Sequence, residues 1–71
     1  RFLREGGLSA REAEVAGLLL RGHTMAAISC KLDISENTVR GHAKNIYRKF
    51  EVHSRQELVD LYERTLEGQG F

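Results

Sequence analysis

The stretch from Ile34 to Phe50, ISENTVRGHAKNIYRKF, constrains the fold more than any other part of the chain. Apolar side chains recur there at steps of three and four residues, at Val39, Ala43, Ile46 and Phe50. This spacing places them on one stripe of an α-helix, which must be buried against other elements. Ser35 is a suitable N-cap, and Glu36 follows in the first turn, where the helix dipole favours an acid. The sequence therefore predicts a helix over residues 36–50 that packs through one face.

Cations occupy the other side of this predicted helix. Arg40, Lys44 and Arg48 follow one another at four-residue steps, so they share a face about a quarter turn or more from the apolar stripe. Asn37 and Gly41 fall on the same side, and Gly41 has no side chain to keep a partner at a distance. We interpret the stretch as a helix that packs through its apolar face and enters the major groove of DNA through its basic face.

The charges of the chain are unevenly distributed. A net charge of +1 over 71 residues does not by itself indicate a nucleic-acid partner. Between residues 37 and 55, however, a single acid, Glu51, stands against five cations, which are Arg40, Lys44, Arg48, Lys49 and Arg55. Segregation of this kind predicts a basic patch on a nearly neutral protein.

Two helices are expected before the central one. Ser9 and Glu12 form a capping box for a helix over Ser9–Arg21, and Gly22 is a typical helix end. Thr24 caps a short helix that runs to Leu32, and a tight turn then leads into the central helix. Two short helices joined in this way form a helix-turn-helix.

A last helix is expected after the central one, with Ser54 and Glu57 as a second capping box. Its apolar stripe consists of Leu58, Leu61, Tyr62 and Thr65. Val59 and Leu66 extend this arc beyond what one small core needs. They are either ordinary exposed apolar residues or a contact surface for a second copy of the domain.

The length allows one domain with a small core. We assign residues 1–7 to a linker or tail, residues 8–67 to an all-α domain of four helices, and residues 68–71 to a C-terminal tail. Because the chain begins with Arg1 and not with methionine, we expect it to be part of a longer protein. The lone Cys30 forms no internal disulfide, which suits the cytoplasm, and no apolar run is long enough for a membrane span.

Catalytic and metal-binding patterns are not apparent. The three histidines, His23, His42 and His53, are too scattered for a recognisable metal site. No nucleophile–base pair, phosphate-binding loop or carboxylate pair appears, so we expect neither an enzyme nor a cofactor. His42 lies in the central helix, where it could contact phosphate, and Tyr47 could either donate its hydroxyl to phosphate or be partly buried.

Three segments, in this order and spacing, resemble the LuxR/FixJ-type helix-turn-helix domain. They are LSAREAEV (residues 8–15), ISENTVRGH (residues 34–42) and NIYRKFEVHSRQEL (residues 45–58). The resemblance implies a four-helix DNA-binding domain at the C-terminus of a bacterial transcription regulator, following a receiver, ligand-sensing or ATPase module. It also implies a homodimer formed through the last helix. Two domains paired in this way would call for an inverted-repeat DNA site, and RNA polymerase is a further candidate partner.

The resemblance also assigns roles to individual residues. Base edges would be contacted by Arg40, Gly41 and Lys44, and the phosphate backbone by Asn37, Thr38 and Arg48. Apart from the resemblance, His42 and Tyr47 are candidate phosphate contacts because of their place in the predicted helix and their side-chain chemistry. In the last helix of this chain, the candidate dimer contact consists of Val59, Tyr62, Glu63 and Leu66. Ala27 stands where the family usually has Glu, so an acid that often ties the helices together is missing here. Gly41 is smaller than the residue found in many members, so the DNA sequence recognised cannot be copied from relatives.

Two other functions remain open at this stage. A sigma-factor region could read a promoter element with a similar helix, but it would lack the first and third segments of the resemblance. A helix-turn-helix could instead serve as a protein-interaction or dimerisation module. Such a module would not need cations on the exposed face of its central helix.

Overall fold

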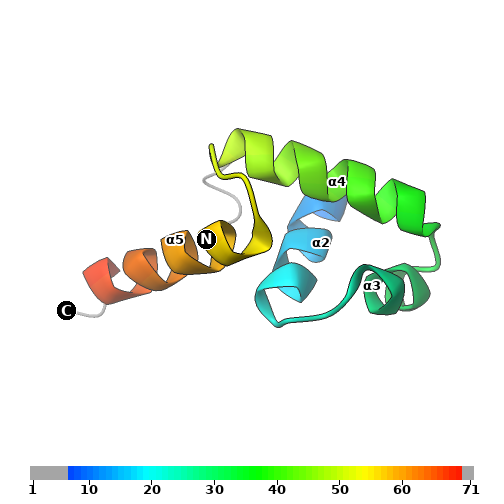
Figure 1. Cartoon of the computed structure of the whole chain (residues 1–71), viewed down its shortest axis with the longest axis horizontal. Coiled ribbons are helices and arrows are strands. Elements are labelled where there is room, and N and C mark those ends of the chain that lie inside the picture. Colours follow the sequence, from blue (N-terminus) through cyan, green and yellow to red (C-terminus); the bar gives the residue numbers. More distant parts are fainter. Residues whose placement is uncertain (1–6, 70–71) are drawn as a thin grey trace.

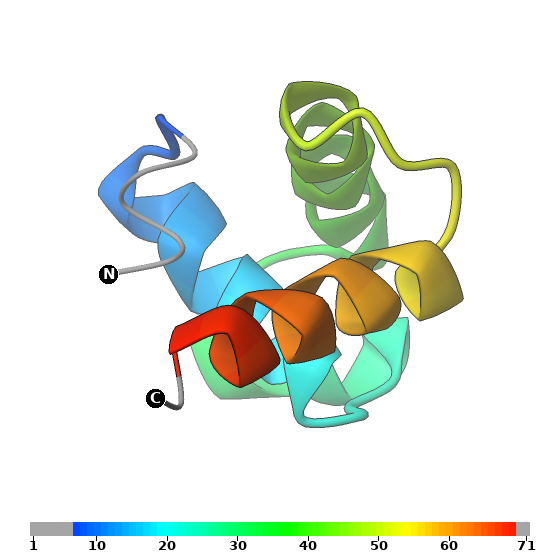
Figure 2. The ribbon, with the colours of Figure 1, turned by 90° about the vertical axis from the view of Figure 1, so that its left-hand side faces the viewer.

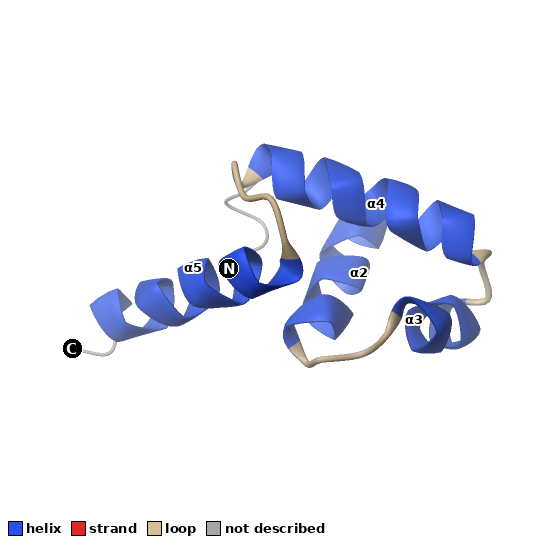
Figure 3. Ribbon diagram, viewed as in Figure 1, coloured by secondary structure: helices blue, strands red, loops and turns tan. Residues whose placement is uncertain are grey.

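A computed structural model describes the backbone of residues 7–69 and the side chains of residues 7–65. Over this range the chain forms α2 (Ala10–Leu20), α3 (Met25–Leu32), α4 (Glu36–Lys49) and α5 (Arg55–Gln69), without a strand (Figures 1 and 3). The expected all-α fold of four helices is therefore confirmed. Helix α5 includes Gly68 and Gln69, which we had assigned to the tail, whereas residues 1–6 and 70–71 lie outside the described range.

Hydroxyl side chains begin the helices where the sequence predicts. Ser9 and Glu12 form the capping box, in which Ser9 Oγ accepts from the Glu12 N–H at 3.2 Å and Glu12 Oε1 accepts from the Ser9 N–H at 3.1 Å. Thr24 and Ser35 accept in the same way at the starts of α3 and α4. These bonds satisfy amides that would otherwise lack a partner, so each start is fixed locally.

The capping box expected at the start of α5 forms only in part. Ser54 Oγ accepts from the Glu57 N–H at 3.2 Å, as predicted. The Glu57 carboxylate, however, accepts from the N–H of His53 at 2.9 Å and not from that of Ser54. Ser54 is therefore the N-cap of α5, as predicted, but the carboxylate bonds the amide one residue before it.

Three helices end with a residue in the left-handed region. Gly22 follows α2 with φ 90°, as expected for a glycine at this position, but Asp33 and Glu51 have φ 56° and 57° without being glycine. The Asp33 turn is closed by a bond from the Ile34 N–H to the Ser29 carbonyl at 3.1 Å. This tight turn sets the direction in which α4 leaves α3.

The core lies where α2, α3 and α4 meet the start of α5. Its eight side chains, each at most 3% exposed, are Val15, Ala16, Leu19, Ile28, Val39, Ala43, Ile46 and Leu58. Helix α4 packs on both α2 and α3, and α5 contacts α2. The predicted stripe of α4 is buried except at its end, where Phe50 is only partly buried.

The apolar stripe expected on α5 contributes less to the core than predicted. Leu58 is fully buried, but Leu61, Tyr62 and Thr65 are only partly buried. Figure 1 shows why, because α5 begins beside α2 and then runs away from the other helices. The later turns of α5 therefore have no neighbouring helix to cover them within the described part of the chain.

Candidate nucleic-acid interface

Helix α4 lies along one edge of the domain, with α2, α3 and α5 all on the same side of it (Figures 1 and 2). Val39, Ala43 and Ile46 face inward and are buried. At ~100° per residue, the positions opposite this stripe are Asn37, Gly41, Lys44 and Arg48. All four are exposed. The fold therefore leaves the face that we expected to contact DNA uncovered.

Two flanks border this outer face. Glu36, Arg40 and Tyr47 fall on one flank, and Thr38, His42 and Lys49 fall on the other. His42 and Tyr47 are half-buried, whereas Arg40 and Thr38 are exposed. The predicted phosphate contacts are thus not on one surface, because His42 and Tyr47 lie on opposite sides of the helix. A helix inserted in a DNA groove has a phosphate backbone on each side, so both flanks of α4 would face phosphates there.

The Arg40 side chain is exposed but has partners on its own helix. It is 60% exposed, its Nη2 lies 3.3 Å from Glu36 Oε1, and its Nη1 lies 3.4 Å from Asn37 Oδ1. These contacts are long and in solvent, so they orient the guanidinium more than they stabilise the helix. Sequence reasoning had given Glu36 only a role in starting α4 and Asn37 only a role at phosphate.

Lys44 and Arg48 differ from Arg40 in this respect. Both are exposed, and within the described residues neither side chain has a hydrogen-bond or ion-pair partner. A cation without an internal partner is available to an external anion without first losing a bond. The contacts with DNA that the sequence suggests for both residues stay predictions.

Lys49 was counted in the predicted basic patch, but the structure takes it out of that patch. Its Nζ lies 2.9 Å from Glu12 Oε1 and donates to the Gly7 carbonyl at 2.9 Å. Arg55 is likewise used internally, because its Nη2 donates to the His23 carbonyl. The patch on α4 therefore consists of Arg40, Lys44 and Arg48, and the other two cations hold the fold together.

Glu12 is the buried partner of Lys49, with 8% of the residue exposed. The hydrogen bond from Lys49 and the N–H of Ser9 hold the pKa of this carboxyl below its ordinary value, although burial acts in the opposite direction. Electrostatic interactions with Lys49 and with the nearby His42 side chain lower the pKa of Glu12 further. A signal for this site was present in the sequence, because Glu12, Val15, Ala16 and Leu19 share one helical stripe, and a buried acid on such a stripe needs a cation.

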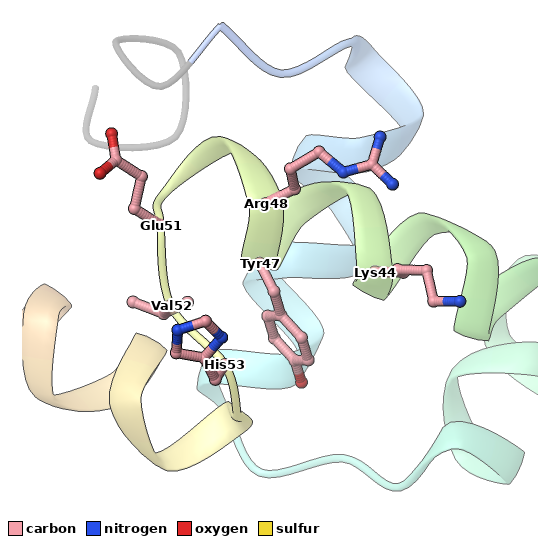
Figure 4. Close-up of a pocket in the computed structure, with 6 residues that line it drawn as sticks. All are labelled: Lys44, Tyr47, Arg48, Glu51, Val52 and His53. Carbon is pink, nitrogen blue, oxygen red and sulfur yellow. The ribbon is translucent and has the colours of Figure 1, made fainter.

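An open hollow of about 560 Å³ lies beside the end of α4. It is lined by Lys44, Tyr47, Arg48, Glu51, Val52 and His53 (Figure 4). Tyr47 is half-buried, in agreement with one of the two sequence expectations, and its contact with phosphate stays a prediction. His53, which sequence reasoning left unassigned, lies exposed in this hollow.

The structure describes the side chains of three of the four residues predicted for dimer contact. Val59 and Tyr62 are half-buried and Glu63 is exposed, and all three lie on one side of α5. The side chain of Leu66 lies outside the described residues. The apolar surface on this side of α5 therefore begins near Val59.

Among the described residues, no group of three or more His, Cys, Asp or Glu side chains is placed to hold a metal ion. None of the described helices has the length and apolar character to cross a membrane. Cys30 is exposed on α3.

Comparison with known proteins identifies the family. Residues 7–62 match the family described as "Bacterial regulatory proteins, luxR family". The chain is 35% identical over 70 residues to the HTH-type transcriptional regulator MalT of Yersinia pestis, which covers 99% of the chain and 8% of that protein. It is 47% identical over 57 residues to the response regulator protein TodT of Pseudomonas putida, which covers 80% of the chain and 25% of that protein.

The chain thus spans a quarter or less of these curated relatives. None of the solved structures matches it. The family match covers the helix-turn-helix, the exposed basic face of α4 and the first turns of α5. The chain therefore belongs to the luxR family of bacterial regulatory proteins and is a DNA-binding helix-turn-helix domain of that family.

Proposed function

We propose that this domain binds double-stranded DNA sequence-specifically, as the output domain of a bacterial transcription regulator that acts in the cytoplasm. In this proposal α4 enters the major groove. The observation that carries it is the uncovered face of α4, where Arg40, Lys44 and Arg48 are exposed on a helix anchored by Val39, Ala43 and Ile46. A rigid, cationic helix face of this kind fits the width and charge of the major groove.

Base recognition is assigned to Arg40, Gly41 and Lys44. The Arg40 fork can donate to O6 and N7 of one guanine together, which is the commonest specific contact in the major groove. Gly41 supports close approach, since a Cβ at this position would meet no atom within 4 Å and the surface there is open. Lys44 lies one turn further along α4 and can reach a neighbouring base.

Phosphate contacts are assigned to both ends and both flanks of α4. Asn37 and Thr38 lie in the first turn, where the helix dipole favours an anion. Because Asn37 Oδ1 accepts from Arg40, its amide NH2 remains free to donate to phosphate. Arg48 serves the outer face, and His42 and Tyr47 serve the two opposite flanks. These contacts fix the register of the domain on DNA but carry little sequence information.

Pairing of two domains is assigned to α5, through Val59, Tyr62, Glu63 and Leu66. The apolar side chains of α5 beyond Leu58 support this, because the domain itself buries them only in part. Two domains paired in this way would place their α4 helices in successive major grooves. The DNA site would then be an inverted repeat with half-site centres about 10 base pairs apart. RNA polymerase is a further partner proposed for the whole regulator.

Selection of binding sites from random duplex DNA, repeated at two salt concentrations, tests this function. We expect a preferred sequence that persists at the higher salt concentration, because base contacts depend less on counterion release than phosphate contacts. The matched control carries Arg40→Ala, Lys44→Ala and Arg48→Ala together and should enrich no sequence. Recovery of random sequence by the wild-type domain at both salt concentrations would overturn the proposal.

A further inference from the structure

The Glu36 carboxylate lies on the flank of the face proposed to read DNA, although an acid there repels phosphates. Its Oε1 is 3.3 Å from Nη2 of Arg40, while Asn37 Oδ1 is 3.4 Å from Nη1 of the same guanidinium. We propose that Glu36 is a positioning residue. Together with Asn37 it orients Arg40 for base recognition, and so raises the sequence specificity of the domain without contacting a base. This inference rests on the proposed function.

Arg40 has enough N–H donors to bond Glu36 and Asn37 and to bond a guanine at the same time. A guanidinium has five N–H groups, of which two are on each Nη and one is on Nε. Glu36 and Asn37 each take one N–H, so each Nη retains one N–H and Nε keeps its own. Bidentate recognition of guanine needs two donors. The internal partners therefore hold the fork without using up the donors that a base requires.

Within the described part of the chain, the other two cations of this face, Lys44 and Arg48, lack the internal partners that Arg40 has. Lys44 and Arg48 are exposed and have no partner among the described side chains, so each can follow a phosphate of any sequence. Only Arg40 of these three is held, and it is the residue whose planar fork reads a base by its geometry. Holding such a side chain before binding reduces the rotamer entropy lost on contact with the correct base.

Glu36 strengthens binding to the preferred site by its hold on Arg40, but it weakens binding to DNA of random sequence. With its side chain 46% exposed, the carboxylate repels the phosphates of every sequence that α4 approaches. An acid in the contact face therefore weakens non-specific binding while its hold on Arg40 favours the preferred site. The two effects have the same consequence, which is a larger ratio between the two affinities.

Two substitutions separate these effects. Glu36→Asp keeps the charge but shortens the side chain, so it should lose its hold on Arg40. We expect Kd for the selected preferred duplex to rise about tenfold and Kd for a scrambled duplex to stay unchanged. Glu36→Gln removes the charge, so binding to the scrambled duplex should tighten severalfold. Glu14→Gln is the matched control, because Glu14 is an exposed acid paired with Arg11 on α2, and it should change neither Kd.

The experiment uses the 71-residue chain, with circular dichroism melts to confirm that every variant is folded. Repeating Glu36→Asp in an Arg40→Ala background should leave the affinity ratio unchanged, since nothing remains to be positioned. The inference is overturned if the single Glu36→Asp variant retains the full ratio, or if it relaxes a base pair other than the one that Arg40→Ala relaxes. A wild-type domain without any preferred sequence would instead overturn the proposed function itself.

Discussion

Replacement of Lys49 by methionine should weaken the fold and leave DNA binding nearly unchanged, although Lys49 is adjacent to Arg48. The Lys49 side chain is 39% exposed, whereas that of its partner Glu12 is 10% exposed. Removal of one partner lowers the free energy of unfolding by about 3–5 kcal/mol in a fully buried ion pair and by about 0–1 kcal/mol in an exposed ion pair. Because Lys49 is partly solvated and the Ser9 N–H still contacts the carboxylate, we expect a loss of about 1–2 kcal/mol.

Thermal unfolding followed by circular dichroism measures this loss. For a domain of this size the melting temperature should fall by roughly 5–15 °C. The matched control is Arg11→Met, which breaks the exposed Arg11–Glu14 pair at 3.6 Å and should cost less than about 0.5 kcal/mol. In a Glu12→Gln background, Lys49→Met should cost much less, because no buried charge is left without its partner.

DNA binding distinguishes the two neighbouring cations. We expect Lys49→Met to leave the dependence of log K on log salt concentration unchanged. Arg48→Ala should lower the slope of that dependence by about 0.9 and weaken binding to all sequences alike. If Lys49→Met lowers the salt slope as Arg48→Ala does, Lys49 belongs to the DNA-binding patch. If its melting temperature equals that of the wild type, the structural role given to Lys49 is wrong.

Four further predictions concern stability and binding. Because the pKa of Glu12 is lowered from 4.5 in the fold, its contribution to stability is complete above that pH and is lost as the pH falls through the lowered value. Urea unfolding at a series of pH values should show this loss in the wild type and a flatter profile for Glu12→Gln; equal profiles would contradict it. Arg40→Ala should cost about 1–3 kcal/mol of DNA-binding free energy and weaken the base preference at one position of the site in a specificity panel. An equal loss of affinity on every sequence would make Arg40 a phosphate contact. Val59→Glu should abolish pairing on DNA while the monomer stays folded, and a dimer that survives in sedimentation would exclude this surface of α5. Glu51→Gly should stabilise the domain by about 0.5–1 kcal/mol, because φ at this position is 57°, and an unchanged or lower urea midpoint would show that no strain is relieved.

The sequence alone determined the helices and the face through which α4 packs. Ser9, Thr24 and Ser35 cap their helices by bonds to amides three residues away, so the neighbouring sequence suffices to predict them. The stripe of α4 is likewise a property of helical periodicity, which needs no knowledge of the other helices. The exposed positions of Arg40, Lys44 and Arg48 follow from that stripe.

Only the tertiary structure decided which cations remain available to bind DNA and which have partners within the fold. Lys49 meets Glu12 across 37 residues of sequence, and Arg55 meets the His23 carbonyl across 32 residues. Such contacts depend on how α2, α4 and α5 pack, and the periodicity of a single helix carries no information about that packing. The limited burial of α5 beyond Leu58 has the same origin, since an apolar stripe is buried only where another helix comes to cover it.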